Sequence, residues 1–226
     1  LNTSYRYAFN QCGKTMALSQ YGTETIETDI KINLTEDKND KQSQNYLFSF
    51  QKETEKKIVG SMPIENVNYS GGVAQNILAN SYFLNYNNFK IDPICIDSGI
   101  SLGLLNYYLK GQLQKLSSVY LGPIPDYNYL SIFKDYEIVD SDENKVSEIL
   151  KDNPVALFQG RSEQGQRGLG NRSLLINPFA QNCLEKINTI KKREWYRPFA
   201  ATITKEKLNS YFFEHKGDGS YMLFTY

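Results

Sequence analysis

Two predicted short strands, each followed by a glycine turn and then by a helical pattern, constrain the fold of this chain most. In the first, a strand over Glu65–Tyr69 (ENVNY) precedes a Ser-Gly-Gly turn and a helix that starts with Val73–Asn80. In the second, a strand over Asp92–Ile96 (DPICI) precedes a turn at Gly99 and a helix that ends near Gly111. Successive strand–turn–helix units are typical of α/β folds, and we therefore expect an α/β protein.

The part that precedes these units is expected to be helical with one polar interruption. A short helix is predicted between Gly13 and Gly22, and an amphipathic helix over Tyr46–Gly60, where aromatic residues precede charged ones. The polar stretch Asn33–Asn45 (NLTEDKNDKQSQN) has the composition of a solvated surface loop.

The part that follows them contains a connector, a helix and a strand. A proline-punctuated connector over Leu121–Tyr129 leads to a charged helix over Ser141–Asn153, capped by its first residue or by Asp142. The apolar run Val155–Gly160 then predicts a strand. We expect a domain boundary within residues 122–153.

Charge and hydropathy exclude several classes of protein. The 226 residues include 25 Lys and Arg against 25 Asp and Glu, so the formal net charge is zero, and 40% of the residues are hydrophobic. This composition is typical of a folded globular protein. A balanced charge argues against a general nucleic-acid or membrane binder, and no apolar run reaches the ~20 residues of a transmembrane helix. We expect neither kind of partner.

Cysteine and histidine usage narrows the chemistry. Cys12, Cys95 and Cys183 are widely spaced and form no CxxC pair, which is typical of a reducing compartment and predicts a cytoplasmic location. The single histidine, His215, excludes a Cys/His zinc site by count. His215 lies in the polar stretch EHKGDGS, so a Ser/His/Asp or Cys/His catalytic group is not expected.

The most informative stretch is Phe158–Pro178 (FQGRSEQGQRGLGNRSLLINP). It places Arg161, Arg167 and Arg172 among four glycines, with Asn171 and Ser173 adjacent. Three guanidinium groups in one loop repel each other unless an anion neutralises them, and the planar fork of arginine matches phosphate or carboxylate. We expect an anion site here rather than a solvated basic loop.

A second basic group lies in Ile187–Ile203 (INTIKKREWYRPFAATI). If the stretch is extended, Lys191, Arg193 and Arg197 share one face, and a helix would also bring Arg193 and Arg197 together. A surface ion-pair cluster that includes Glu194 is the competing interpretation. Because this group adds to the arginines of the preceding stretch, we favour an anion site over the ion-pair cluster.

Two weaker signals accompany the glycine turns. Gly71 and Gly72 could let backbone N–H groups approach a phosphate, although plain turn chemistry is the commoner use of such a pair. Asp97 could hold a cation beside phosphates, but the spacing alone favours a carboxylate that caps the following helix.

In order and nearly in wording, six segments of this chain resemble the NodU/CmcH-type O-carbamoyltransferases. They are GKTMALSQYG, SGGVAQNILAN, CIDSGISLG, LGP, FQGRSEQGQRGLGNRSLLINP and NTIKKREWYRPFAA. The resemblance covers nearly the whole chain from Tyr7, and the last two segments are the most specific. Gln166 departs from the proline that is usual in the family, and Ala17 and Gln20 depart from the first motif.

The resemblance implies an α/β fold with two domains and an ATP-dependent reaction. Residues 1–140 would be the C-terminal part of an actin-like ATPase (ASKHA-type) domain, 141–153 a linker helix, and 154–226 the start of a YrdC-like domain. The YrdC-like domain would form carbamoyl-adenylate from carbamoyl phosphate and ATP. The actin-like domain would pass the carbamoyl group to a hydroxyl of a small-molecule or sugar acceptor, with a divalent metal ion, iron or magnesium, as cofactor.

The resemblance also implies roles for individual residues. Asp97 would be a metal ligand, and Gly71, Gly72 and Asn76 would cradle the adenylate. Carbamoyl phosphate and nucleotide phosphate would be held by Lys191, Arg193, Arg197 and Arg167. Further loop candidates are Arg161, Asn171, Arg172 and Ser173.

The resemblance further implies that the chain is a fragment, inactive alone, because the histidine ligands and two later motifs of the family are not in it. Two alternatives stay open. One is a threonylcarbamoyl-AMP or tRNA-modifying relative, and the other is a nucleotide-binding module without turnover. The oligomeric state is undetermined.

Overall fold

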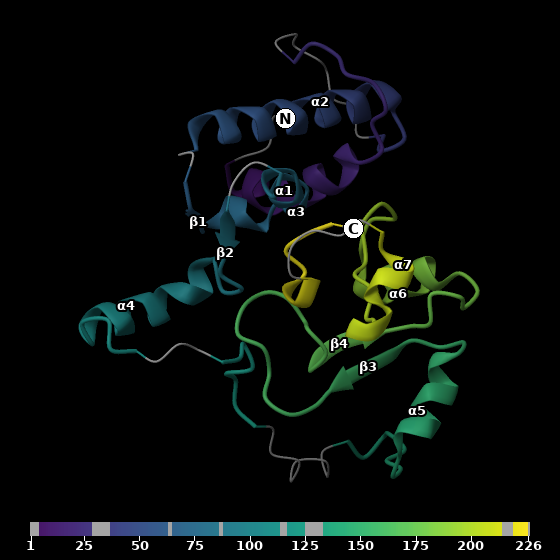
Figure 1. Ribbon diagram of the computed structural model, residues 1–226. Coiled ribbons are helices and arrows are strands. Elements are labelled where there is room, and N and C mark those ends of the chain that lie inside the picture. Colours follow the sequence, from purple (N-terminus) through teal and green to yellow (C-terminus); the bar gives the residue numbers. More distant parts are fainter. Residues whose placement is uncertain are drawn as a thin grey trace. The chain divides into compact units, whose positions relative to one another are not determined.

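A computed structural model describes residues 5–28, 37–62, 65–85, 88–113, 117–124, 133–213 and 219–225, and the side chains of the first helix from Cys12 onward. The chain forms two compact units (Figure 1). The first unit comprises Leu1–Asp97 and Tyr196–Tyr226, and the second comprises Ser98–Trp195. The expected domain boundary within residues 122–153 stays a prediction.

The first unit is built around a small parallel sheet. Its strands β1 (Val67–Tyr69) and β2 (Phe89–Ile91) pair in parallel, with Val67 opposite Phe89. Parallel strands need a crossover connection, and the 3₁₀ turn η1 with the helix α3 supplies it. The other elements are α1 (Tyr5–Ser19), α2 (Lys41–Ser61), η1 (Gly72–Gln75), α3 (Ile77–Phe83), η4 (Lys205–Lys207), α7 (Leu208–Tyr211) and η5 (Gly219–Tyr221).

Aromatic side chains form the centre of this unit. Phe83 is fully buried, and its ring lies 5.4 Å from that of Phe89 and 5.7 Å from that of Tyr69, in edge-to-face arrangements. Asn80, also fully buried, donates from Nδ2 to the carbonyl oxygens of Ala74 (2.8 Å) and Leu223 (2.9 Å). The C-terminal segment is therefore fastened to α3 by a buried side-chain amide.

The predicted surface loop over Asn33–Asn45 is wrong in its last part, and residues 33–36 lie outside the described residues. The helix α2 already begins at Lys41, where Asp40 caps it by accepting from the backbone N–H of Ser43 at 2.8 Å. Polar side chains in its first turns are buried because they accept hydrogen bonds from the neighbouring backbone. Asn45 Oδ1 accepts from the N–H of Thr23 at 2.9 Å, and equivalent bonds join Glu24 to Asn45 and Ile26 to Ser49.

The second strand lies earlier than predicted. Pairing ends at Ile91, and Asp92–Ile96 is not a strand. Asp92 Oδ1 accepts from the N–H of Ile94 at 2.8 Å and closes a turn across Pro93, which has no N–H to give to a ladder. The helix predicted between Gly13 and Gly22 and the amphipathic helix predicted over Tyr46–Gly60 are confirmed, but α1 and α2 begin earlier, at Tyr5 and Lys41.

In its described residues, the second unit contains an antiparallel hairpin and three α-helices. Strands β3 (Val155–Phe158) and β4 (Arg172–Leu175) pair with Phe158 opposite Arg172. The helices are α4 (Ile100–Tyr108), α5 (Glu143–Leu150) and α6 (Cys183–Lys191). The predicted helices at α4 and α5 and the predicted strand at β3 are confirmed, and Asp142 is the cap of α5.

The backbone of the second basic group is neither one strand nor one helix. The helix α6 ends at Lys191, and Lys192 adopts a left-handed conformation with φ of 50°. Arg193 and Arg197 therefore lie in irregular chain, on neither a common strand face nor a common helix.

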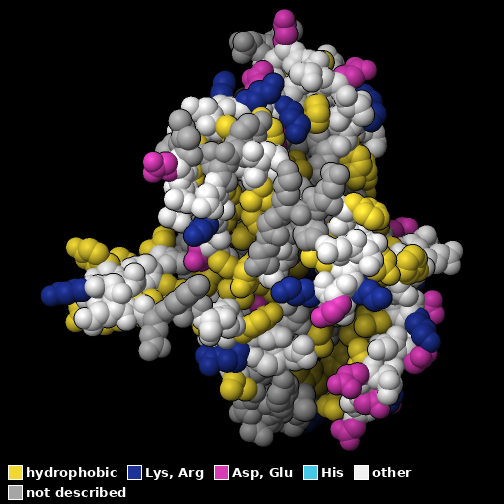
Figure 2. Space-filling model, viewed as in Figure 1, with side chains coloured by type: hydrophobic (Ala, Val, Ile, Leu, Met, Phe, Trp, Pro, Cys, Tyr) yellow, Lys and Arg dark blue, Asp and Glu magenta, His cyan; other side chains and the backbone are white. Residues whose placement is uncertain are grey.

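The surface of α4 is unusually apolar. Ile100, Leu104, Tyr107 and Tyr108 are all more than half exposed, and apolar side chains gather on this helix in the space-filling view (Figure 2). Within the described ranges, no helix combines the length and apolarity needed to cross a bilayer.

Two glycines give a matched test of packing in the first unit. A Cβ on Gly22 would lie 2.5 Å from the carbonyl oxygen of Gln44 and from Cβ of Phe48, whereas a Cβ on Gly13 would meet no atom within 4 Å. We expect Gly22→Ala to lower the free energy of unfolding by roughly 1–3 kcal/mol. Gly13→Ala, inside α1, should leave it unchanged or raise it by up to about 1 kcal/mol. Urea unfolding of the two variants checks this, and equal stabilities would contradict the packing described.

Candidate functional site

The glycine-rich stretch between β3 and β4 forms an ordered loop, residues 159–171, here called the arginine loop. At its base, the N–H of Gln159 donates to the carbonyl of Asn171 at 3.1 Å and extends the hairpin. Gly160, Gly165 and Gly170 have φ of 51°, 101° and 114°, a region that side chains with a Cβ rarely adopt. The glycines are therefore required by the path of the loop.

A buried carboxylate organises the loop from inside. The side chain of Glu163 is fully buried. Its Oε1 accepts from the backbone N–H groups of Leu169 (2.6 Å), Asn171 (2.9 Å) and Arg172 (3.3 Å). Its Oε2 accepts from Nε of Arg172 at 2.9 Å, and Nη2 of Arg172 donates to the carbonyl of Glu163 at 2.6 Å. One side chain thus closes the loop and neutralises an arginine.

The same contacts set the protonation state of Glu163. Burial alone would raise the pKa of the carboxyl, but the hydrogen bonds from Arg172 and from the backbone N–H groups of Leu169 and Asn171 lower that pKa from 4.5 to about 2. The carboxylate is therefore ionised at neutral pH, and its ionised form stabilises the fold by roughly 3 kcal/mol.

The outer side of the loop is fastened to the segment 117–124. Arg161 donates from Nε to the carbonyl of Gly122 at 2.8 Å and from Nη2 to that of Leu121 at 3.0 Å. The N–H of Gln164 donates to the carbonyl of Val119 at 2.7 Å. The predicted LGP motif therefore serves as a support for the arginine loop.

The loop also meets the turn that follows Asp97. Gln164 donates from Nε2 to the carbonyl of Ser98 at 3.0 Å, and the position of a Cβ on Gly165 lies 3.7 Å from Oγ of Ser98. The second glycine turn and the arginine loop, 66 residues apart in sequence, are thereby neighbours.

Four of the predicted loop residues hold the loop together. Arg172 pairs with Glu163, and Arg161 donates to backbone carbonyls. Asn171 donates from Nδ2 to the carbonyl of Arg161 at 2.7 Å, and Oγ of Ser173 accepts from the N–H of Gly170 at 3.0 Å. The premise that only an external anion could neutralise these guanidinium groups does not hold for Arg172. Ligand binding by the four residues stays a prediction.

The remaining predicted cations divide between the units. Arg167, Lys191 and Arg193 belong to the second unit, where Arg167 and Arg193 are half-buried and Lys191 is exposed at the end of α6. Arg197 belongs to the first unit, and its buried Nε has no hydrogen-bond partner among the described residues. Their convergence on one ligand stays a prediction.

In the glycine turn of the first unit, Gly71 and the nearby Asn76 form hydrogen bonds within the protein. The N–H of Gly71 donates to the carbonyl of Cys95 at 2.6 Å, so it is directed at the protein. Asn76 caps α3 by accepting from the N–H of Ala79 at 3.1 Å, and its side chain exchanges two hydrogen bonds with Gln51. Gly72 is exposed, with open space around it.

Asp97 alone does not make a metal centre. It is exposed at the start of the 3₁₀ turn η2 (Asp97–Gly99). Among the residues that the structure describes, no three His, Cys, Asp or Glu side chains gather into a group that could hold a metal ion.

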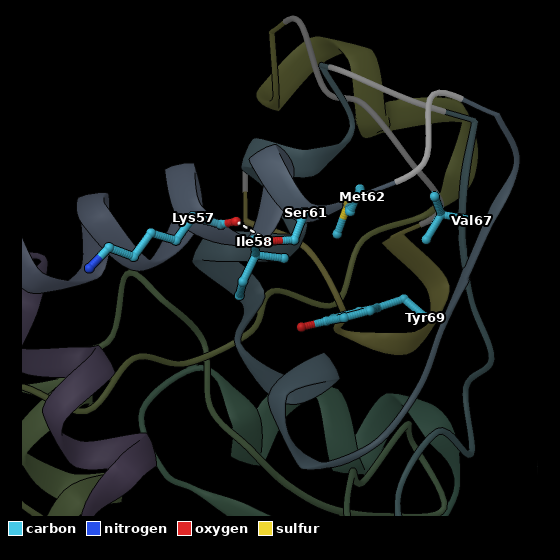
Figure 3. A pocket seen from close by; sticks show the side chains of 6 residues that line it. All are labelled: Lys57, Ile58, Ser61, Met62, Val67 and Tyr69. Atoms are coloured by element: carbon cyan, nitrogen blue, oxygen red, sulfur yellow. Dashed lines mark hydrogen bonds between the residues drawn. The ribbon is translucent and has the colours of Figure 1, made fainter.

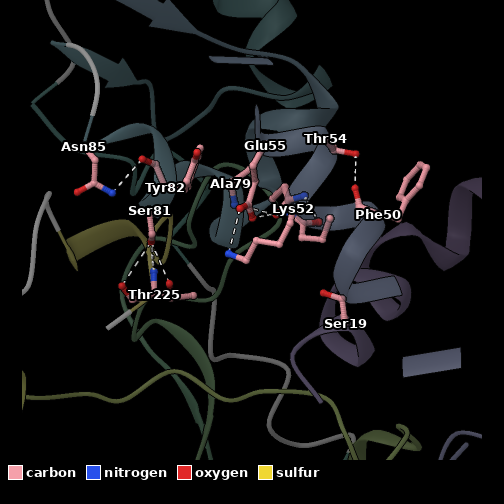
Figure 4. Close-up of polar contacts among 12 residues, drawn as sticks. Ser19, Phe50, Lys52, Thr54, Glu55, Ala79, Ser81, Tyr82, Asn85 and Thr225 are labelled. Carbon is pink, nitrogen blue, oxygen red and sulfur yellow. Dashed lines mark hydrogen bonds and ion pairs between the residues drawn. The ribbon is translucent and has the colours of Figure 1, made fainter. Parts of the chain in front are cut away.

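A second buried carboxylate lies between α2 and α3 (Figure 4). Glu55, 1% exposed, accepts from Nε2 of Gln51 at 2.9 Å and from Nζ of Lys52 at 3.1 Å. The Lys52 ammonium also lies 5.7 Å from the ring centre of Phe48 and 5.8 Å from that of Tyr82. This cluster supports α3 and therefore the glycine turn that precedes it.

The end of α2 and the start of the sheet border an open hollow of about 390 Å³ (Figure 3). Its walls are mainly apolar, and burial raises the pKa of the Tyr69 phenol. The lining residues are Lys57, Ile58, Ser61, Met62, Val67 and Tyr69.

Comparisons with known proteins find a matching family model and several similar proteins. Residues 146–226 match the family model described as Carbamoyltransferase C-terminus. The nodulation protein NolNO of Sinorhizobium fredii is 34% identical over 167 residues, which covers 66% of this chain and 25% of that protein. A 3'-hydroxymethylcephem-O-carbamoyltransferase of Streptomyces clavuligerus is 32% identical over 169 residues, 69% of this chain and 31% of that protein.

A second 3'-hydroxymethylcephem-O-carbamoyltransferase, from Amycolatopsis lactamdurans, is 47% identical over 70 residues, 31% of this chain and 13% of that protein. In the first two comparisons the matched region spans between a quarter and a third of the relative's own length.

The protonation state of Glu163 predicts a pH dependence of stability. The carboxyl has a pKa of about 2 in the folded chain and near 4.5 when unfolded, so the unfolded chain binds more protons between these values. Glu163 should therefore contribute fully above about pH 5 and lose its contribution as pH falls from 4.5 toward 2. Urea unfolding as a function of pH checks this, because Glu163→Gln should remove that part of the slope. An unchanged slope in the variant would contradict the assignment.

Proposed function

Because the chain belongs to the NodU/CmcH-type carbamoyltransferase family, we propose that its protein transfers a carbamoyl group to a hydroxyl group of a small-molecule or sugar acceptor. One observation carries the proposal. The arginine loop lies inside the matched region, and its backbone is fixed by the buried Glu163. Fixed cationic groups are what a reaction that develops negative charge on oxygen requires.

The proposed reaction begins with carbamoyl phosphate and ATP. One carbamoyl phosphate, one ATP and one water would give carbamoyl-adenylate, inorganic phosphate and pyrophosphate. The acceptor hydroxyl would then attack the carbamoyl carbon, losing its proton, with AMP as the leaving group. We assign the first step to a YrdC-like domain at residues 154–226 and the second to an actin-like domain at residues 1–140, joined by the helix over 141–153.

The proposed ligands of the phosphate groups are Arg167, Lys191, Arg193 and Arg197. One guanidinium group can bind two phosphate oxygens at once, and a lysine ammonium adds a compact positive charge. Such donors stabilise the charge that develops when pyrophosphate leaves. Gly72 is open to solvent and remains suited to contact the adenylate.

A divalent metal ion, iron or magnesium, is the proposed cofactor of the transfer step, where it would polarise the carbamoyl oxygen. Asp97 would supply one carboxylate ligand. Since no group of three His, Cys, Asp or Glu gathers among the described residues, no step is assigned to the ion.

Lys191 tests the assignment of the cations. Lys191→Ala is made in the full protein. It should lower carbamoyl-phosphate-dependent pyrophosphate release by ~100-fold or more, because the positive charge that Lys191 places beside the leaving group is lost. Lys151→Ala is the matched control, since Lys151 is exposed and pairs only with Glu148 among the charged groups described. Near-normal turnover of the Lys191 variant would refute its role.

The acceptor class is tested by product analysis. With carbamoyl phosphate and ATP supplied, we expect a carbamate ester on small hydroxylated acceptors and none on transfer RNA. Modification of transfer RNA alone would favour a threonylcarbamoyl-type relative. Nucleotide binding without any product would favour a binding module and overturn the proposal.

A further inference from the structure

We infer that Glu163 is a positioning residue for the anion site, holding the arginine loop in the conformation that presents Arg167 to the ligand. This inference rests on the proposed function. Its basis is the juxtaposition of one buried carboxylate with both ends of the segment that contains Arg167.

The geometry places Arg167 inside the part of the loop that Glu163 closes. The carboxylate is bonded to the N–H groups of Leu169 and Asn171, so residues 164–168 form a short excursion between fixed ends. Short closed segments have few conformations, and the backbone position of Arg167 is therefore restricted before any ligand arrives. Pre-organised donors bind more tightly because less order is lost on binding.

The backbone pairing of the hairpin is made without this carboxylate. Strands β3 and β4 pair from Val155 opposite Leu175 to Phe158 opposite Arg172, and Gln159 adds a further bond to Asn171. The bonds of Glu163 to the N–H groups of Leu169 and Asn171 instead fall in the part where Gly165 and Gly170 have positive φ. Glycines leave a chain many alternatives, so the loop needs a constraint that the hairpin does not supply.

A positioning role has a kinetic signature that differs from simple loss of fold. If only a fraction of the folded molecules has the competent loop, the apparent dissociation constant rises by the inverse of that fraction, while saturating ligand restores the competent state. Partial unfolding instead removes active molecules and lowers kcat with KM unchanged. The split between KM and kcat therefore separates the two.

The test uses Glu163→Gln in the protein as encoded, with steady-state pyrophosphate release measured against carbamoyl phosphate. Glutamine preserves the size but not the charge, and its NH₂ group would oppose the Nε donor of Arg172. We expect KM for carbamoyl phosphate to rise by roughly 10-fold or more, with kcat changed far less. Glu163→Asp keeps the charge on a shorter side chain, and its KM should fall between those of the wild type and Glu163→Gln.

Glu148→Gln is the matched control, because Glu148 forms an exposed ion pair with Lys151 in the same unit. It should leave KM unchanged. A folded Glu163→Gln enzyme with the KM of the wild type, or with a lowered kcat at constant KM, would overturn the inference. If Glu163→Gln does not fold, the same comparison is made with Glu163→Asp. If the wild-type protein itself does not use carbamoyl phosphate, the proposed function fails, and this inference falls with it.

Discussion

A carboxylate without water is stable only if other donors replace the water, and burial without them costs several kcal/mol. Glu163 meets that condition with three backbone N–H groups and the guanidinium of Arg172. These donors can face one side chain only because the loop bends at positive-φ glycines. The path of the arginine loop, its contact with the segment 117–124 and the placement of its cations all depend on this arrangement.

In the first unit, neutral side chains rather than a carboxylate form the buried hydrogen bonds to the backbone. Asn45 and Ser49 bond to the backbone at Thr23–Ile26, and Asn80 bonds to the C-terminal segment. Buried amides and hydroxyls therefore hold irregular chain where apolar clusters are small. A polar sequence in this protein is consequently a poor indicator of solvent exposure, as α2 shows in its first turns.

The arginines of the candidate site divide by what surrounds them. Arg172 is neutralised internally and Arg161 is bonded to carbonyl oxygens, so both serve the architecture of the loop. The proposed phosphate contacts therefore fall mainly to Arg167, Lys191, Arg193 and Arg197. In such a site, residues that never touch the substrate decide how well the touching residues are placed.

Local patterns in the sequence were sufficient for the helices α4 and α5, the strand β3 and the glycine turn after β1, because spacing and turn chemistry act over a few residues. The sequences of the motifs were sufficient to predict the similarity to carbamoyltransferases that the comparisons also find. The partner of Arg172 and the helical start of α2 were not predictable, since Glu163 and Asn45 look like ordinary surface residues by composition. Their roles depend on which backbone groups the folded chain brings to them, and long-range packing alone decides that.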